Sequence, residues 1–131
     1  MIEVYTDGAS SGNPGMSGAG IYIKHSGKVY EYAIPLGEMS NHEAEFHAVN
    51  EALDICLGKF PDEILSFQSD SQVVVDAIEK QFIKNKNFKT VLGEILEKAN
   101  TFPFFFMKWI PSRQNFHADR LAKQAIQMEL K

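Results

Sequence analysis

The chain has 131 residues, 44% of them hydrophobic and 23% charged, which is the composition of one soluble globular domain with a buried core. Its formal net charge of −4 argues against a protein that coats nucleic acid broadly, because such proteins neutralise many phosphates with Lys and Arg. The single cysteine, Cys56, lies in an apolar stretch and excludes an intramolecular disulfide and a thiolate metal cluster, so we expect it to be a core residue.

The first third of the chain predicts three antiparallel strands. Residues 2–7 are rich in β-formers, and a run of turn formers over 8–15, too long for a tight hairpin, predicts a broad loop after them. Residues 18–25 and 28–36 are two further β-like runs. Ser26-Gly27 between them suits a two-residue hairpin turn.

A helix is predicted next, over 41–57. Ser40 and Glu43 have the spacing of a capping box, in which each side chain accepts a hydrogen bond from a backbone N–H group at the helix start. The residues that define its buried face repeat at helical spacing, and they are Val49, Ala52, Leu53 and Cys56. One turn before Val49 stands Glu45, which we therefore expect on the core side of the helix.

The remaining elements alternate between strand and helix. We expect a strand over 64–70, helices over 71–80 and 88–100, a strand over 104–110, and a closing helix with Asn115 as its N-cap. The three aromatics from Phe104 to Phe106 alternate between the two sides of their strand, and core packing is favoured over a base-stacking platform. The order βββ-α-β-α-α-β-α, without repeats or a linker, indicates one mixed sheet with helices packed on it, in a single domain over 1–131.

Four acidic residues stand where an apolar run ends or a helical stretch begins: Asp7, Glu45, Asp70 and Asp119. If the strands ending in Asp7 and Asp70 are parallel neighbours, both carboxylates emerge at the carboxyl edge of the sheet, where open α/β sheets bind ligands. Crowded carboxylates repel one another, so they raise their pKa values or bind a cation. Mg²⁺ prefers such oxygen ligands, and two ions about 4 Å apart can assist in-line phosphoryl displacement.

Each acid also has a structural explanation when it is taken alone. Asp7 before a glycine fits a turn, and Asp70 fits an N-cap. Glu45 and Asp119 fit the first turn of a helix, where the helix dipole favours acids. Position alone leaves these alternatives open.

Four motifs carry a more specific signal. They are Tyr5-Thr6-Asp7-Gly8-Ala9-Ser10-Ser11-Gly12-Asn13-Pro14-Gly15 and its continuation to Gly20, Asn41-His42-Glu43-Ala44-Glu45, Ser69-Asp70-Ser71-Gln72, and Asn115-Phe116-His117-Ala118-Asp119-Arg120-Leu121-Ala122. In this order and at these separations they resemble the motifs of type 1 ribonuclease H, over nearly the whole chain.

The resemblance implies an α/β fold of the ribonuclease H type, a mixed five-stranded sheet with three antiparallel strands followed by two parallel ones, flanked by helices. It implies an endonuclease that hydrolyses the RNA strand of RNA–DNA hybrids and leaves a 5′-phosphate. Asp7, Glu45, Asp70 and Asp119 would bind two Mg²⁺ ions with the substrate, and Mn²⁺ could replace Mg²⁺.

The resemblance also implies nucleic-acid contacts. Asn13, Asn41 and Gln72 would contact the minor groove, and Ser40 would lie near a phosphate of the DNA strand. This agrees with the physical argument that the shallow minor groove of an A-like duplex exposes 2′-hydroxyls to small polar side chains. A turn former at Asn13, a helix-start residue at Asn41 and an exposed helical Gln72 are the structural alternatives.

The chain departs from many bacterial members of this family in two places. No His lies in the segment 110–115, where those members carry a catalytic one, so Arg113 becomes the candidate for proton or phosphate handling and His117 the second candidate. The basic handle is shortened, and its remnant would be a nucleic-acid-binding patch made of Lys80, Phe82, Lys84, Lys86 and Lys89. A solvated helix junction is the alternative for that patch.

Two classes of function follow from the sequence. The first is an active hybrid-cleaving ribonuclease H, favoured by the four intact acids. The second is a catalytically weak or silent paralogue that acts as a nucleic-acid-binding module, and a resolvase-like or reverse-transcriptase-associated domain is a lesser alternative. Since no stretch approaches the roughly 20 apolar residues of a membrane span, we expect a cytoplasmic monomer without a membrane partner.

Overall fold

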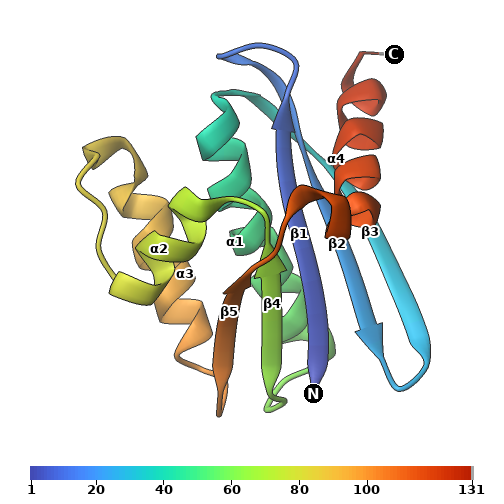
Figure 1. Cartoon of the computed structure of the whole chain (residues 1–131), viewed down its shortest axis with the longest axis vertical. Helices are drawn as coiled ribbons and strands as arrows, with labels where there is room; N and C mark the ends of the chain where they lie inside the picture. Colours follow the sequence, from blue (N-terminus) through green and yellow to red (C-terminus); the bar gives the residue numbers. More distant parts are fainter. Residues whose placement is uncertain (131) are drawn as a thin grey trace.

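The computed structural model describes residues 1–130 and contains one mixed sheet of five strands in the order β3-β2-β1-β4-β5 (Figure 1). The strands are β1 (Ile2–Ser10), β2 (Gly15–His25), β3 (Lys28–Met39), β4 (Leu65–Ser69) and β5 (Phe105–Trp109). Strands β1, β2 and β3 pair antiparallel, whereas β4 pairs parallel with β1 and β5 parallel with β4. The predicted fold class, three antiparallel strands followed by two parallel ones, is confirmed.

Four α-helices and two short 3-10 turns complete the fold within residues 1–130. They are α1 (Asn41–Lys59), α2 (Gln72–Lys80), η1 (Lys86–Phe88), α3 (Lys89–Ala99), η2 (Ser112–Gln114) and α4 (Phe116–Glu129). The predicted capping box of α1 is present, because the Ser40 hydroxyl accepts from the Glu43 N–H and the Glu43 carboxylate accepts from the Ser40 N–H. Among residues 1–130, no helix is both long and apolar enough to span a membrane.

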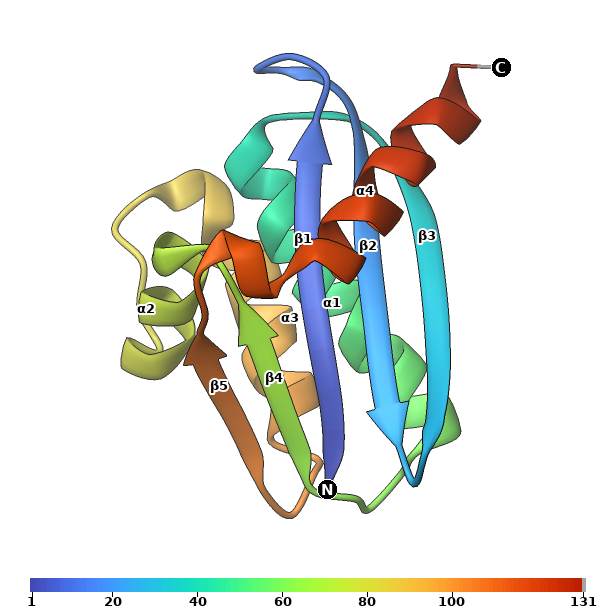
Figure 2. The same cartoon turned by 45° about the vertical axis from the view of Figure 1, so that its right-hand side comes forward.

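The helices form two unequal layers on the sheet (Figure 2). Helix α1 packs on β1 and β2 and against α3, and α2 packs on β5, so these three helices share one face. Helix α4 packs alone on the other face, on β1, β2 and β3. The second face is therefore covered at only one end.

The main hydrophobic core lies between the sheet and the layer of α1, α2 and α3. The predicted buried face of α1 is confirmed, since Val49, Ala52, Leu53 and Cys56 are all fully buried. Burial raises the pKa of the Cys56 thiol to about 12, so Cys56 is a neutral core side chain, as predicted.

The broad loop predicted over 8–15 is wrong in its extent. Strand β1 continues to Ser10 and β2 begins at Gly15, which leaves residues 11–14 as the turn. The turn formers adopt strand structure because pairing with β2 continues from Asp7 to Ser10. The other predicted bounds agree with the structure within three residues.

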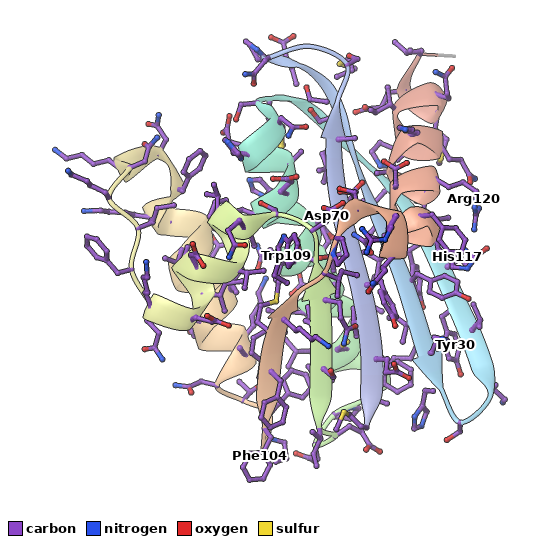
Figure 3. The ribbon with its side chains drawn as sticks, viewed as in Figure 1. Tyr30, Asp70, Phe104, Trp109, His117 and Arg120 are labelled. Carbon is purple, nitrogen blue, oxygen red and sulfur yellow. The ribbon has the colours of Figure 1, made fainter. Side chains whose placement is uncertain are left out.

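Core packing is the wrong prediction for two of the three consecutive phenylalanines. Phe105 packs against Phe67 in the core, with ring centroids 5.1 Å apart. Phe104, which immediately precedes β5 and is labelled in Figure 3, is 60% exposed, and Phe106 is 52% exposed. The two rings stack on each other outside the core. The alternation was correct, but α4 packs on β1, β2 and β3 and leaves the second face of β5 without a helix.

Candidate active site

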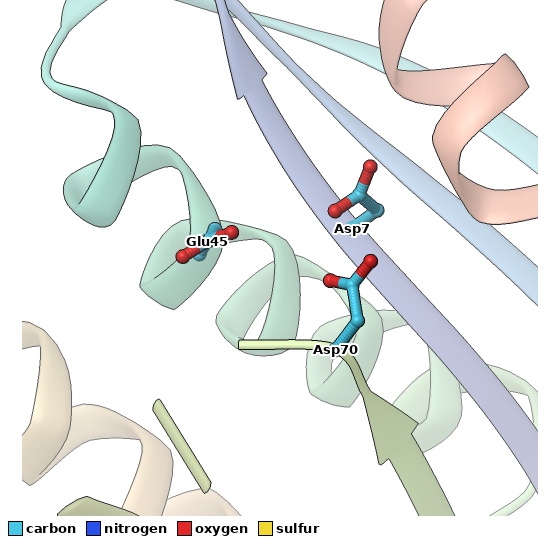
Figure 4. Close-up of side chains that lie close together, drawn as sticks. All are labelled: Asp7, Glu45 and Asp70. Atoms are coloured by element: carbon cyan, nitrogen blue, oxygen red, sulfur yellow. The ribbon is translucent and has the colours of Figure 1, made fainter. Parts of the chain in front are cut away.

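Three carboxylates converge beside the parallel pair of β1 and β4 (Figure 4). Asp7 lies on β1, Asp70 follows β4, and Glu45 lies on α1, and one oxygen of each lies within 4.8 Å of the others. Pairing of β1 with β4 ends at Thr6 opposite Ser69, so Asp7 and Asp70 stand side by side at the carboxyl edge of the parallel strands. The predicted juxtaposition therefore occurs, although β1 itself continues beyond Asp7.

A glycine allows α1 to bring Glu45 to this edge. A Cβ atom on Gly8 would lie 2.2 Å from the carbonyl carbon of Ala44 and 2.4 Å from the backbone nitrogen of Glu45. Only a residue without a side chain permits this approach of helix to strand. The Gly8 in the first motif thus has a packing role next to Asp7.

A second glycine allows the close approach of α4 to β2. Gly20 is the register partner of Asp7 on β2, and a Cβ atom there would lie 1.9 Å from the carbonyl oxygen of Ala118. The first turn of α4 therefore lies directly on β2 and carries Asp119 toward Asp7. Asp119 is outside the group of three, but it lines the same pocket, and after burial and the charge of Asp70 its charge helps to raise the pKa of Asp7.

The electrostatics of the site are those of crowded anions. Asp7 is 7% exposed, and burial, followed by the charges of Asp70, Asp119 and Glu45, raises its pKa from 3.8 to about 9. Burial also raises the pKa of Glu45, although hydrogen bonds from Ser71 and His42 oppose that shift. The folded chain thus holds carboxylates together where ionisation is unfavourable without a cation.

The donor set fits a hard divalent cation. Every converging side chain offers carboxylate oxygen, the ligand type that Mg²⁺, Mn²⁺ and Ca²⁺ prefer, and the unfavourable ionisation of Asp7 is what a bound cation would relieve. The carboxylates line an open pocket of about 390 Å³, which leaves room for a further ligand. Its lining residues are Asp7, Gly8, Ala9, Asn41, Glu45, Asp70, Ser112, Phe116 and Asp119.

The predicted minor-groove residues lie at different distances from this pocket. Asn41 lines it, and the Asn13 side chain accepts a hydrogen bond of 3.1 Å from the Asn41 N–H, which ties the β1–β2 turn to the start of α1. Ser40 immediately precedes Asn41 and is the N-cap of α1. Gln72 is exposed at the start of α2, where its amide donates to Asp76 at 2.8 Å. The first three therefore form a contiguous rim, and Gln72 stands two residues beyond Asp70.

The predicted basic patch lies away from the carboxylates, along the end of α2 and the start of α3. Its members are exposed, and they are Lys80, Phe82, Lys84, Lys86 and Lys89. Phe82 is 62% exposed, and together with Lys80 and Lys84 it lines a shallow surface hollow. The patch is accessible to a large ligand, but it does not contribute to the pocket itself.

The two candidate replacements for the missing catalytic histidine are not brought into the pocket. Arg113 is exposed on η2, and only its neighbour Ser112 lines the carboxylate pocket. His117 lines a different cavity, where its ring stacks on Tyr22 at 4.1 Å. The structure lends no support to a proton-transfer role for His117.

Three further residues of the site were missed from the sequence. Ser71 caps α2, and its side chain opposes the rise in the pKa of Glu45 that burial causes. Lys123 pairs with Asp119 at 3.0 Å, which the i,i+4 spacing could have revealed. Asn115 precedes α4, but the predicted side-chain cap is wrong, because its buried amide donates instead to the Thr6 carbonyl at 2.9 Å. That bond fixes the start of α4 to β1, one residue before Asp7.

A mixed sheet in this order, with a carboxylate cluster at the carboxyl edge of its parallel strands, defines an α/β protein of the ribonuclease H fold class. Sequence comparison narrows that class. The ribonuclease H family model matches residues 1–127. The chain therefore belongs to the type 1 ribonuclease H family of enzymes.

Individual relatives agree with this assignment. The chain is 39% identical to "Putative hydrolase EbsB" of Enterococcus faecalis over 128 residues, which cover 97% of this chain and 95% of EbsB. It is 30% identical to a ribonuclease H of Actinobacillus succinogenes over an alignment of 141 positions, gaps included. That alignment covers 95% of this chain and 88% of the relative. Among solved structures, LC11-RNase H1 in complex with an RNA/DNA hybrid superposes with a TM-score of 0.90 at 29% identity and covers 100% of both chains.

Proposed function

We propose that the chain hydrolyses the RNA strand of RNA–DNA hybrids with two divalent cations, Mg²⁺ being the expected ion and Mn²⁺ a usable substitute. The convergence of Asp7, Glu45 and Asp70 on this fold carries the proposal. The likeness to a ribonuclease H solved with an RNA/DNA hybrid supports the choice of substrate.

The side chains have separate parts in this scheme. Asp7 and Asp70 extend from neighbouring strands and Glu45 from the facing helix, so a cation would be held from two sides. Asp119 lies at the outer side of the pocket, 44% exposed and paired with Lys123, and would complete the set. When bound, divalent cations neutralise the phosphate and activate water for attack.

Substrate positioning falls to the rim. Asn41 opens onto the pocket, and its backbone is held by the Asn13 side chain. Both polar side chains can reach base edges and 2′-hydroxyls, which is how an A-like minor groove is recognised. The exposed basic patch would contact phosphates farther along the duplex.

The test is cleavage of labelled RNA–DNA hybrid, duplex RNA and duplex DNA in Mg²⁺ or Mn²⁺. We expect cleavage of the hybrid alone, its loss in Asp70→Asn, and its retention in Glu97→Gln, which neutralises an exposed acid on α3. Binding of the hybrid without cleavage in either metal would contradict the proposal.

One observation favours the second candidate function, a weak or silent nucleic-acid-binding module. Within residues 1–130, no Lys, Arg or His lines the carboxylate pocket, so a proton donor for the leaving oxygen is not placed there. The variant Arg113→Ala tests whether Arg113 supplies this function from outside the pocket. Slower cleavage in Arg113→Ala under saturating Mg²⁺ would show that this exposed arginine takes part in the reaction, whereas an unchanged rate would exclude such a role.

A further inference from the structure

A second cavity adjoins the carboxylate pocket on the α4 face of the sheet. Its volume is about 210 Å³, and its lining is Tyr5, Tyr22, Lys24, Gln114, Asn115, Phe116 and His117. Phe116 lines both this cavity and the carboxylate pocket, so the two hollows meet at its side chain. We refer to this second hollow as the aromatic cavity.

Its aromatic rings form a connected row in which one pair is stacked, one is tilted and one meets edge to face. The ring of His117, labelled in Figure 3, lies 4.1 Å from the Tyr22 ring with an interplanar angle of 6°, and the Phe116 ring lies 4.1 Å from His117 with a tilt of 38°. Tyr5 meets Tyr22 edge to face at 6.1 Å. The row therefore runs from the sheet to the rim of the carboxylate pocket, where Phe116 is 60% exposed.

The exposure of Phe116 is unfavourable for an isolated protein. A phenylalanine at the first position of α4 leaves most of its ring in water, although three neighbouring rings are stacked or packed nearby. An exposed aromatic face at the end of a row of packed rings is a platform for another flat ring. A flat ring that stacked on Phe116 would lie next to the carboxylate pocket, which Phe116 also lines.

The charged side chains that line the aromatic cavity indicate which class of flat ligand it would bind. In the described part of the chain, Lys24 is its one lining Lys or Arg, and its ammonium lies 6.0 Å from the centre of the Tyr5 ring. No Asp or Glu lines it. An aromatic platform with an ammonium suits a nucleotide, whose base stacks and whose phosphate is anionic.

A base inside a duplex is already stacked on both faces and paired along its Watson–Crick edge. The aromatic cavity would therefore accept a base that has left the duplex, next to the scissile region. Single strands that extend a hybrid supply such bases without the free energy of unpairing.

We propose that the aromatic cavity binds an unpaired nucleobase of a single strand that continues from the hybrid, with Phe116 as the stacking face and Lys24 as the phosphate contact. The inference rests on the proposed function, because the hybrid in the carboxylate pocket is what delivers the strand to Phe116. It assigns to the chain a preference for hybrids that end in a single-stranded extension.

The experiment compares binding of a blunt hybrid with hybrids that carry four unpaired nucleotides at the 5′ or the 3′ end. Both RNA and DNA extensions are used, and Ca²⁺ replaces Mg²⁺ to hold back cleavage. Since one base stacked on an aromatic side chain contributes a factor of about 10 to affinity, we expect about tenfold tighter binding of one extended hybrid. The RNA and DNA arms identify the strand that is bound.

Variants identify the side chains that cause the tighter binding of the extended hybrid. The ratio of extended to blunt affinity should fall to about 1 in Phe116→Leu and in Tyr22→Leu, and it should persist in Phe116→Tyr. Phe106→Leu is the matched control, because Phe106 is 52% exposed against 60% for Phe116 but lies on β5 outside the aromatic cavity. A merely structural Phe116 would change both affinities together and leave their ratio intact.

Failure of the inference is distinguishable from failure of the proposed function. Equal affinity for blunt and extended hybrids, with the blunt hybrid still cleaved in Mg²⁺, would overturn the inference alone. If no hybrid is bound or cleaved, the proposed function fails, and photo-cross-linking of a short single-stranded RNA that carries 5-iodouridine decides the inference separately. Adducts on Phe116, Tyr22 or His117 would support it, whereas adducts elsewhere, or none, would contradict it.

Discussion

Replacement of Asp7 by Asn is expected to stabilise the metal-free protein while abolishing cleavage of the hybrid. Asp7 is 7% exposed, and burial is the largest cause of a pKa raised from 3.8 to about 9. The charges of Asp70, Asp119 and Glu45 add to that shift. Asn preserves the size of the side chain and removes the charge that folding disfavours.

The sign and the size follow from proton linkage. Because the pKa of Asp7 is higher in the folded state than in the unfolded state, its contribution to stability is fully present below about pH 3.8 and is lost as pH rises toward about 9. At about 1.36 kcal/mol per pH unit, the loss at pH 7 is at most about 4 kcal/mol. Neighbouring carboxylates share the repulsion and relax when Asp7 ionises, so we expect a gain of about 1–3 kcal/mol in Asp7→Asn at pH 7.

Urea unfolding at pH 5, 7 and 9 measures this gain. The stability difference between Asp7→Asn and the unchanged protein should grow with pH in EDTA, and Glu97→Gln, on exposed surface, should show no such trend. Mg²⁺ at ten times its dissociation constant should stabilise the unchanged protein by about 1.4 kcal/mol and the variant by less. A variant no more stable than the unchanged protein at pH 7, or a difference that shrinks with pH, would refute the assignment of buried, crowded charge.

Three further outcomes are expected. Gly20→Ala should destabilise the fold by at least about 3 kcal/mol in thermal unfolding, because its Cβ would collide with the Ala118 carbonyl, whereas Gly93→Ala in α3, with open space around it, should stabilise by about 0.5–1 kcal/mol. Lys98→Met should lower stability by about 1 kcal/mol through the lost 2.9 Å ion pair with Asp54, and high salt should shrink that difference. Lys84→Gln should weaken hybrid binding and reduce the slope of log affinity against log salt by about 1, and an unchanged slope would exclude a phosphate contact.

Local signals in the sequence were sufficient for most of the fold. The capping box at Ser40 fixed the start of α1, and the spacing of its apolar residues identified the buried face, from which Glu45 could be placed. The position of Asp70 at the end of an apolar run located the carboxyl edge of a parallel strand. These features depend on residues close together in the chain, which is why a sequence reveals them.

The errors arose where distant segments decide the outcome. Phe104 and Phe106 are exposed because α4 packs on the other end of that sheet face, and nothing near residue 104 records where α4 lies. Asn115 has the residue type of an N-cap, yet its side-chain amide donates a hydrogen bond to the Thr6 carbonyl, 109 positions away. The partnership of His117 with Tyr22 is equally non-local.

Electrostatics link metal binding to substrate binding in this site. A phosphate that approaches Asp7, Glu45 and Asp70 meets negative charge, and the ammonium of Lys123, whose charge interacts with Asp7, is already paired with Asp119. The net charge of −4 supplies no general attraction to compensate, and the basic patch lies outside the pocket. Divalent cations reverse the local sign, so the hybrid and the metal should each bind more tightly in the presence of the other, by the same factor. The acidic composition, which argues against a general nucleic-acid-coating protein, is therefore compatible with a nuclease whose affinity for its substrate depends on the metal.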